Sequence, residues 1–301
     1  MKRGWISWDQ TELPRAAFDA RLAVAREHLA QRNLPALVVY TDIWRSNRVR
    51  HFSNFMPYWN RALLVIPRED PPVLLCGLSP RVYPWIRSVT ILEDILPSPN
   101  LAQRLLQLCS DNSWKRIGAL DFAQFQHDLY VPLAGGGVEI VNVSLPSVPD
   151  DWELTMHRRA AKMARDILSE ELPRSVGSLD YEFTGRLERR YRSAGAEDLV
   201  VLLTNGDTPP IPARSAVLSN DFSVALALEY RGHWIKIVRN AHGEPVSIPP
   251  AGAYLETLSG PYPFESGDSS LFAARWEVDS NGRRLFCGDT YWRGKNGTEL
   301  L

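Results

Sequence analysis

The chain has 301 residues, enough to bury a substantial core in one large domain or in two of ordinary size. Hydrophobic residues make up 45% and charged residues 23%, as in ordinary folded proteins. Lys plus Arg (34) nearly balance Asp plus Glu (35), so no net field favours nucleic acid or an anionic membrane, and neither is expected as a partner. The three cysteines, Cys76, Cys109 and Cys287, are too widely spaced for a zinc motif or a disulfide framework.

The sequence shows no targeting or membrane signal. Residues 1–9 lack the apolar core of a signal peptide. No apolar run approaches the ~20 residues that a membrane-spanning helix needs. We therefore expect a cytoplasmic protein.

The first half of the chain alternates between helical and strand patterns. Apolar residues recur at helical spacing over residues 15–33, which predicts an amphipathic helix there. A further helix is expected at 101–108, and apolar strands are expected at 34–40, 61–67, 72–76, 116–121 and 138–143. This alternation predicts an α/β domain built on a central sheet.

A linker with two prolines, residues 145–150, separates this part from the rest. Asp150 or Asp151 is a good N-cap for a helix over 152–172, and a second helix is expected at 180–192. Strands then follow at 198–203, 222–230, 233–238, 270–278 and 284–292, with Asn281-Gly282 as a hairpin turn. The sequence thus predicts an α/β domain at residues 1–148 and an α+β domain at 149–301.

The most informative segment is the expected hairpin at residues 224–239. It reads Val-Ala-Leu-Ala-Leu-Glu-Tyr-Arg-Gly-His-Trp-Ile-Lys-Ile-Val-Arg. This pattern resembles the metal-binding hairpin of the creatinase / Xaa-Pro peptidase (pita-bread, peptidase M24) family. That hairpin runs apolar-Asp-apolar-Gly, then Glu-Tyr-x-Gly-Tyr, then Asp before a final Ile-x-Arg. The positions where the family has its two aspartates are Ala225 and Lys236.

Four other segments resemble motifs of the same family, in the same order along the chain. Residues 48–55 resemble an element of its N-terminal domain, and residues 153–160 resemble the first helix of its C-terminal domain. Residues 191–197 resemble the end of the second helix, and residues 288–301 the closing strand. The resemblance implies a creatinase N-terminal-like α/β domain followed by a truncated, pita-bread-like α+β domain.

Active metallopeptidases of this family hold a pair of divalent ions with two Asp, one His and two Glu, because hard cations close together need bridging anionic oxygens. Ala225 has no donor atom, and the Lys236 ammonium has no lone pair and repels a cation. The resemblance places the two late Glu positions at Arg275 and Gly288. It therefore implies a metal-free protein that needs no cofactor.

The histidines of the family's mechanisms have no counterpart at the expected places. The interval between Arg239 and Ser270 reads as a loop, and His242 lies too early in it to replace the family's ligand. Creatinase itself works without metal through a histidine upstream of the hairpin. No histidine occurs between His157 and His233, and residues 205–214 offer only Asp207 and Thr208 as polar groups of interest besides their arginine.

Several residues remain candidates for a role at the former site. Lys236 is either a functional amine or, as we favour, a structural cation paired with Asp289 or Glu277. Arg239 is expected to be structural, and His233 to lie exposed or at a domain contact. The resemblance also implies contacts with substrate or partner for residues of the N-terminal element and of the hairpin: Trp44, Arg48, Trp59, His233, Trp234 and Arg239.

The leading hypothesis is a peptidase-inactive homologue that acts as a binding or partner subunit, either a homodimer or a heterodimer with an intact paralogue. The alternative is a metal-independent hydrolase or lyase acting on a C–N bond of a small carboxylate-bearing substrate. Its candidate catalytic residues are Lys236, Arg275, Asp207 and Asp289. A peptide-binding module is a third possibility. Because the former site is more basic than in active relatives, a carboxylate is the expected small ligand.

Overall fold

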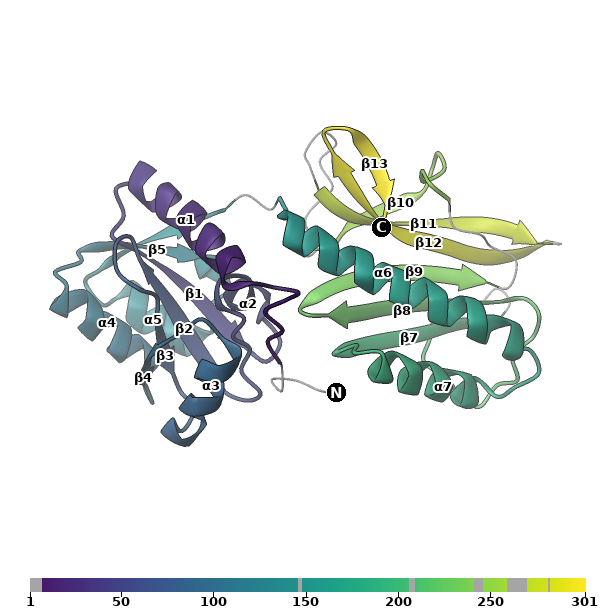
Figure 1. The fold of residues 1–301 in the computed structure, drawn as a ribbon, viewed down its shortest axis with the longest axis horizontal. Helices are drawn as coiled ribbons and strands as arrows, with labels where there is room; N and C mark the ends of the chain where they lie inside the picture. The colour runs from purple at the N-terminus through teal and green to yellow at the C-terminus, as the bar shows by residue number, and fades with distance from the viewer. Residues whose placement is uncertain (1–6, 146–147, 206–208, 241–245, 259–269, 281) are drawn as a thin grey trace. The chain divides into compact units, whose positions relative to one another are not determined.

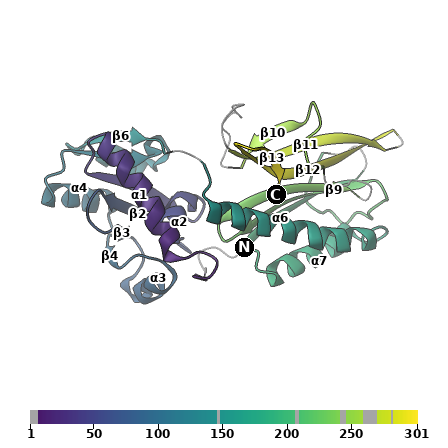
Figure 2. The same cartoon turned by 45° about the horizontal axis from the view of Figure 1, so that its top comes forward.

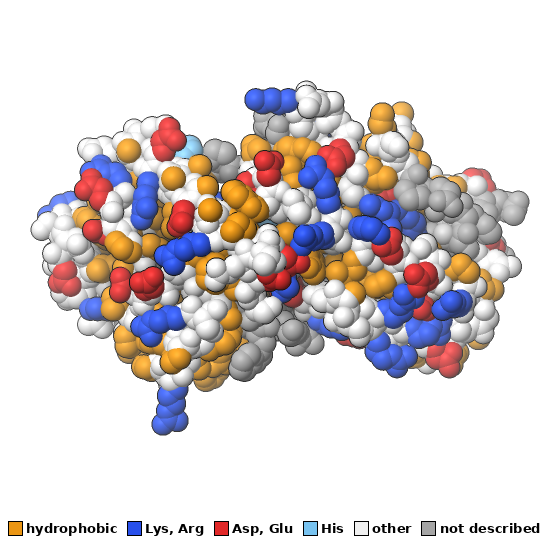
Figure 3. All heavy atoms as spheres, in the orientation of Figure 1, with side chains coloured by type: hydrophobic (Ala, Val, Ile, Leu, Met, Phe, Trp, Pro, Cys, Tyr) orange, Lys and Arg blue, Asp and Glu red, His pale blue; other side chains and the backbone are white. Residues whose placement is uncertain are grey.

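The computed structural model describes residues 7–145, 148–205, 209–240, 246–258, 270–280 and 282–301. The chain divides into two compact units, Lys2–Pro146 and Ser147–Leu301, each drawn in Figure 1. No helix of the described residues has the length and apolar character needed to cross a membrane. On the face drawn in Figure 3, cationic and anionic side chains are interspersed.

The N-terminal unit is an α/β layer around a six-stranded sheet of order β4-β3-β2-β1-β5-β6. Strand β2 is antiparallel to both of its neighbours, and the other pairs are parallel. The strands are β1 Ala36–Asp42, β2 Arg61–Pro67, β3 Val73–Cys76, β4 Asp94–Pro97, β5 Arg116–Leu120 and β6 Glu139–Val143. The helices are α1 Arg15–Gln31, α2 Asn47–Ser53, α3 Tyr83–Val89, α4 Leu101–Asp111 and α5 His127–Ala134, with short 3₁₀ turns at Pro80–Val82 and Phe122–Gln124.

The C-terminal unit is an antiparallel sheet of order β10-β11-β12-β9-β8-β7, with β13 paired to β12. Its strands are β7 Asp198–Asn205, β8 Phe222–Tyr230, β9 His233–Asn240, β10 Tyr254–Thr257, β11 Ser270–Ser280, β12 Arg283–Gly294 and β13 Gly297–Leu300. Its helices are α6 Asp151–Glu171 and α7 Asp180–Ser193, with a 3₁₀ turn at Leu172–Arg174. Figures 1 and 2 both show α6 running along β8 and β9.

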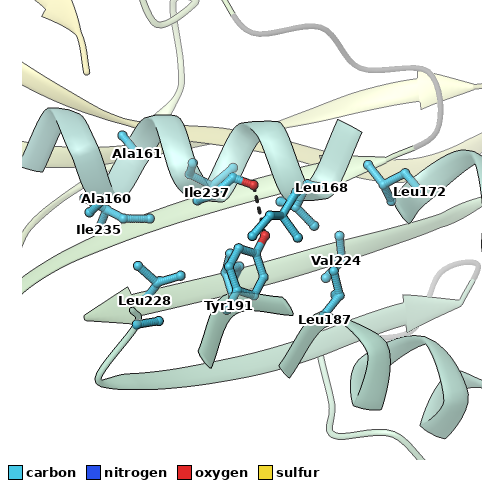
Figure 4. Packing of buried hydrophobic residues seen from close by; sticks show 14 of the residues in the cluster. Ala160, Ala161, Leu168, Leu172, Leu187, Tyr191, Val224, Leu228, Ile235 and Ile237 are labelled. Atoms are coloured by element: carbon cyan, nitrogen blue, oxygen red, sulfur yellow. Dashed lines mark hydrogen bonds between the residues drawn. The ribbon is translucent and has the colours of Figure 1, made fainter. Parts of the chain in front are cut away.

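Helix α6 begins at Asp151, one residue before the predicted start, and its N-cap is Asp150, one of the two predicted candidates. The Asp150 side chain accepts a hydrogen bond from the Glu153 backbone N–H, and the Glu153 side chain accepts one from the Asp150 backbone N–H. Each side chain thus satisfies a backbone N–H that would otherwise have no partner at the start of the helix. The apolar side of α6 then packs with α7 and the sheet in one buried cluster, shown in Figure 4. Within it the Tyr191 hydroxyl donates to the Ala164 carbonyl oxygen at 2.9 Å.

The two faces of this sheet are different. Side chains alternate along a strand, and Val224, Leu226, Ile235 and Ile237 lie in the cluster with α6 and α7. The residues between them point to the opposite side, against which no helix of the described residues packs. We call this side the open face. Its residues include Val200, Leu202, Ala225, Ala227, Lys236, Val238, Tyr254, Glu256, Ala273, Arg275 and Gly288.

The helices and strands predicted from the sequence are present, with ends that differ by at most three residues. Six short elements were not predicted: α2, α3, α5, β4, β10 and β13. The interval expected to be a loop before Ser270 thus contains a strand, β10, and no helix within its described part, residues 246–258. Residues 146–147 of the predicted linker, residues 241–245 with His242, and Asn281 of the predicted turn lie outside the described residues.

Candidate functional site

One row of directly paired residues crosses the open face at the predicted former metal positions. From β7 to β10 it contains Leu202, Ala225, Val238, Gly288, Arg275 and Tyr254. Three of the positions that the family resemblance singles out, Ala225, Gly288 and Arg275, therefore share this row. Register alone brings them together, because the pairing of β8, β9, β12 and β11 sets which residues stand opposite each other.

Lys236 lies on the same face in the neighbouring row. It stands opposite Ala227, and Thr290 bridges its backbone: the Lys236 N–H donates to Thr290 Oγ1, and that hydroxyl donates to the Lys236 carbonyl oxygen, both at 2.9 Å. The Lys236 Nζ pairs with Glu256 Oε1 at 2.9 Å. The predicted partners, Asp289 or Glu277, are wrong, since Glu256 on the unpredicted strand β10 takes this place.

The Lys236–Glu256 pair joins strands that are three places apart in the sheet. At about 4.8 Å per strand, these backbones would be roughly 14 Å apart in a flat sheet. The two side chains therefore lean toward each other over the intervening strands, where the small residues Ala273 and Thr290 leave them room. Both side chains are about 40% exposed, at 40% and 41%, so their attraction is screened by water.

Arg275 is the second cation of the open face. It is exposed, and its guanidinium carbon lies 5.2 Å from the centre of the Tyr254 ring on the paired strand. No carboxylate of the described residues pairs with it. Lys236 and Glu256 pair with each other, so Arg275 is the cation of these three groups that lacks a carboxylate partner among the described residues; farther along the same face, Arg284 pairs with Glu277 at 4.0 Å.

Gly288 allows no side chain in the present backbone. A Cβ atom there would lie 2.6 Å from the Ala274 carbonyl oxygen and 3.3 Å from Val238 Cγ2. A carboxylate at this position would therefore need a shift of the sheet itself, which is more than a substitution in place.

These residues do not fit a pair of divalent cations. Ala225 and Gly288 supply no side-chain ligand, while Lys236 and Arg275 present positive charge where a cation would need oxygen donors. No group of three or more His, Cys, Asp or Glu placed to hold a metal ion occurs among the described residues.

Asp289 lies on the helix-facing side of the sheet, away from Lys236 and Arg275. Its two carboxylate oxygens each accept a bond of 2.8 Å from Arg239 Nη2, and Arg165 of α6 lies 3.9 Å away. Arg239 also donates to the Gly288 carbonyl oxygen at 2.7 Å. Burial raises the pKa of Asp289, and the two arginines oppose that rise. This buried ion pair ties β9, β12 and α6 together, so Arg239 has a structural role.

The remaining candidates are distributed over both units. His233 stands at the start of β9 with its ring centre 4.9 Å from that of the buried His157 on α6, and Trp234 is half-buried on the open side. Asp207 lies outside the described residues. The four candidate catalytic residues are therefore not brought together, and of those described only Lys236 and Arg275 share the open face.

In the N-terminal unit, Trp44 and Trp59 are 64% and 60% exposed. Trp44 follows strand β1 in a turn held by Asp42, whose Oδ1 accepts from the Trp44 and Arg45 N–H groups, both at 2.8 Å. Arg48 pairs with Asp121 at 3.6 Å. The two rings are exposed on separate loops, Trp44 between β1 and α2 and Trp59 between α2 and β2.

Sequence reasoning missed two members of the open face, Glu256 and Tyr254. Both lie on β10, where residues 254–257 read Tyr-Leu-Glu-Thr. The aromatic and β-branched residues of this short run favour a strand, and Leu255 between two polar positions gives the alternation. That signal was present but only four residues long.

Several solved peptidases match the fold of this chain. An Xaa-Pro dipeptidase from Bacillus anthracis matches at TM-score 0.71 and 14% identity, covering 94% of this chain and 97% of that one. An X-Pro aminopeptidase from Thermotoga maritima MSB8 matches at TM-score 0.70 and 13% identity, covering 92% and 97%. The dipeptidase PepE from Mycobacterium ulcerans matches at TM-score 0.68 and 12% identity, covering 98% and 96%.

No protein-family model matches the sequence, and no curated protein sequence matches it. The structural matches extend over both units, so the resemblance to the creatinase / Xaa-Pro peptidase family is confirmed at the level of the fold. An N-terminal α/β unit followed by a pita-bread-like unit is the architecture of this chain.

Proposed function

We propose that this chain, which has the fold of Xaa-Pro peptidases, is a metal-free and peptidase-inactive protein that acts as a binding or partner subunit. One observation carries the proposal. The register of β8, β9, β12 and β11 brings Ala225, Gly288 and Arg275 into one row, with Lys236 in the next. Cations and side chains without donors thus occupy the face on which the family resemblance places carboxylates.

The electrostatics of the face support this proposal. Two unit charges of the same sign repel by about 4 kcal/mol at 4 Å where the effective dielectric constant is near 20. Lys236 is neutralised by Glu256, and Arg275 has no carboxylate partner among the described residues. A divalent ion entering here would be repelled by Arg275, and the nearby Glu256 carboxylate is already paired with Lys236.

The partner role is supported by the N-terminal unit. Exposed tryptophans are enriched at interfaces because they bury a large apolar area at little cost in side-chain entropy. Trp44 and Trp59 both stand exposed, and the Asp42 carboxylate holds the turn that carries Trp44. We propose that these side chains contact a second copy of the chain or an intact paralogue.

Metal content and peptide turnover test the proposal together. The protein is purified without chelator and supplied with Mn²⁺, Co²⁺ or Zn²⁺, and its bound metal is measured beside its hydrolysis of Xaa-Pro dipeptides. We expect neither stoichiometric metal nor turnover. Stoichiometric metal accompanied by turnover would contradict the proposal.

Mass determination in solution tests the partner role. Light scattering on size exclusion is expected to show a species larger than one chain, either alone or after mixing with an intact paralogue from the same source. Trp44→Ser and Trp59→Ser are expected to shift it toward the single chain. Exposed Val24 on α1 offers a control, because Val24→Ser removes an apolar side chain elsewhere on the unit. A single-chain mass in every mixture would exclude this part of the proposal.

A further inference from the structure

We infer that the open face binds a monocarboxylate with an apolar body, whose carboxylate is held by Arg275 and whose body lies on the strands next to it. This inference rests on the proposed function, since it needs a face that holds no metal ion. It adds the chemical class of the ligand, and it follows from two features of the face that lie side by side.

The first feature is the state of Arg275. A guanidinium offers parallel N–H donors that match the two oxygens of a carboxylate. Arg275 is exposed and contacts the Tyr254 ring, and no carboxylate of the described residues uses its donors. Stacking on Tyr254 holds the guanidinium in place without consuming those donors, because a cation–π contact uses the face of the group. The site is therefore preorganised for an anion.

The second feature is an apolar shelf on the strands beyond Arg275. It is defined by side chains of β7, β8 and β9 on the open face: Val200, Leu202, Ala225, Ala227 and Val238. Val200 is 49% exposed, and the other four are half-buried. Between the shelf and Arg275, the row contains only Gly288, so no side chain of that row separates the cation from the apolar strands.

Lys236 and Glu256 define one side of this arrangement. Their ion pair extends along the neighbouring row, so that this row carries a paired cation and carboxylate and no unpaired charge of these two residues. Lys236 is already paired with Glu256, so a second carboxylate on the ligand would find no unpaired cation there, whereas a single carboxylate is satisfied by Arg275. This charge count favours a monocarboxylate over a dicarboxylate.

The width of the shelf limits the length of the ligand. Strands β9 and β7 lie two places apart at about 4.8 Å per strand, so the shelf, which begins one strand beyond Gly288, is roughly 10 Å wide across the sheet. A saturated chain of about eight carbons covers that distance. Each added methylene that lies on the shelf should tighten binding by about twofold to fourfold, the lower value because the shelf buries one side of the chain only.

Binding of straight-chain carboxylates to the full-length protein tests the inference. Isothermal titration with acetate, butanoate, hexanoate and octanoate is expected to give affinities that rise with chain length. Methyl octanoate keeps the chain and lacks the charge, and it is expected to bind about tenfold more weakly or worse than octanoate. Equal binding of the acid and its methyl ester, or no binding of any acid, would overturn the inference.

Two variants distinguish the contribution of Arg275 to binding from that of the apolar shelf. Arg275→Gln should lower the affinity for every acid by a similar factor, and Val238→Thr, which adds a hydroxyl to the shelf at nearly constant volume, should weaken octanoate and leave acetate unchanged. Arg284→Gln is the control for Arg275, because Arg284 lies on the same hairpin beside Glu277 and outside the row. An equal loss in Arg284→Gln and Arg275→Gln would overturn the inference.

Failure of this inference and failure of the proposed function give different results. A protein that takes up stoichiometric metal and cleaves dipeptides contradicts the proposed function whatever its affinity for octanoate. If the protein shows neither metal nor turnover and binds none of the carboxylic acids, the proposed function is still supported. Only the inference of a carboxylate site is then wrong.

Discussion

At position 288 the sheet has room for a hydrogen atom only. The Ala274 carbonyl oxygen would lie 2.6 Å from an added Cβ, and this atom belongs to the backbone, which cannot rotate away. We expect Gly288→Ala to lower the free energy of unfolding by about 1–3 kcal/mol, as overpacking of an ordered interior does. Chemical denaturation followed by circular dichroism measures it.

Gly185 is the matched control for this substitution. It lies within α7, and an added Cβ there meets no atom within 4 Å. Gly185→Ala should raise stability by about 0.5–1 kcal/mol, because alanine loses less backbone entropy in a helix than glycine does. Equal and small effects of the two substitutions would show that β11 and β12 are packed less tightly than described.

Arg239 and Asp289 form the buried ion pair behind the open face. Their side chains are 7% and 0% exposed, so removing the arginine leaves a buried carboxylate with only the more distant Arg165, at 3.9 Å, to compensate its charge. Arg239→Met should cost about 3–5 kcal/mol of stability. Arg158→Met removes an ion pair of similar geometry to Glu299 whose side chains are each 45% exposed, and it should cost about 1 kcal/mol or less. A comparable loss in both variants would contradict the structural role of Arg239.

The pairing of single residues was partly predictable. A structural role for Arg239 followed from the family resemblance, in which it occupies the position of the arginine that closes the hairpin. The partner of Lys236 did not follow, because Glu256 is 20 residues away on a strand that was not predicted. Ion pairs across a sheet depend on strand order, and local periodicity carries no information about strand order.

At the scale of elements, the start of α6 was predicted to within one residue. Asp150, Glu153 and the apolar run after them are a capping box that can be recognised in the sequence, and both of its hydrogen bonds are present. Asp150→Ala should cost about 1 kcal/mol, measured by thermal unfolding. Asp151→Ala, one residue into the helix, is expected to cost less. The opposite ranking would place the cap at Asp151.

His157 is a buried residue of α6 on the side that faces β9, and its Nδ1 has no hydrogen-bond partner. Burial lowers its pKa from 6.5 to about 4, and Glu153 and the Trp234 backbone oppose this, while the His233 ring packs against it. The unfolded chain therefore binds a proton more readily than the folded protein between these two pH values. Stability is full above pH 6.5 and falls as the pH drops toward 4, by about 3 kcal/mol in total from this group.

Replacing the group tests this dependence. His157→Gln keeps a polar side chain that does not titrate, so the part of the slope between pH 6.5 and 4 that is due to His157 should disappear. The comparison is made by urea unfolding at several pH values in this range. Identical slopes for the two proteins would show that His157 titrates in the folded state as it does in the unfolded chain.

Element length explains which elements were missed. The long helices and strands carry enough periodicity to be recognised, whereas β10 and β13 have four residues each and α2 and α3 have seven. α5 contains Pro132, which argues against a helix in a sequence read without its neighbours. Such short elements are stabilised by the strands and helices around them, and this support becomes visible only in the folded structure.

At the scale of the whole molecule, both units follow the fold of Xaa-Pro peptidases at 12–14% identity. The apolar pattern and the order of the strands specify this fold, and those features tolerate extensive change of individual side chains. Most positions on the open face lie outside that buried core, although Gly288 is packed against the backbone of β11. Side chains such as Ala225, Lys236 and Arg275 are therefore compatible with this fold, which separates the question of fold from that of chemistry.

The most direct test of the central claim is a titration of the purified protein with Mn²⁺, followed by the electron paramagnetic resonance signal of the free ion. The account predicts that this signal rises in proportion to the added Mn²⁺ from the first addition, because the row that contains Ala225, Gly288 and Arg275 and the neighbouring Lys236 offer no carboxylate at those positions. Loss of the free-ion signal until about two equivalents have been added would show a dinuclear site and would contradict the account.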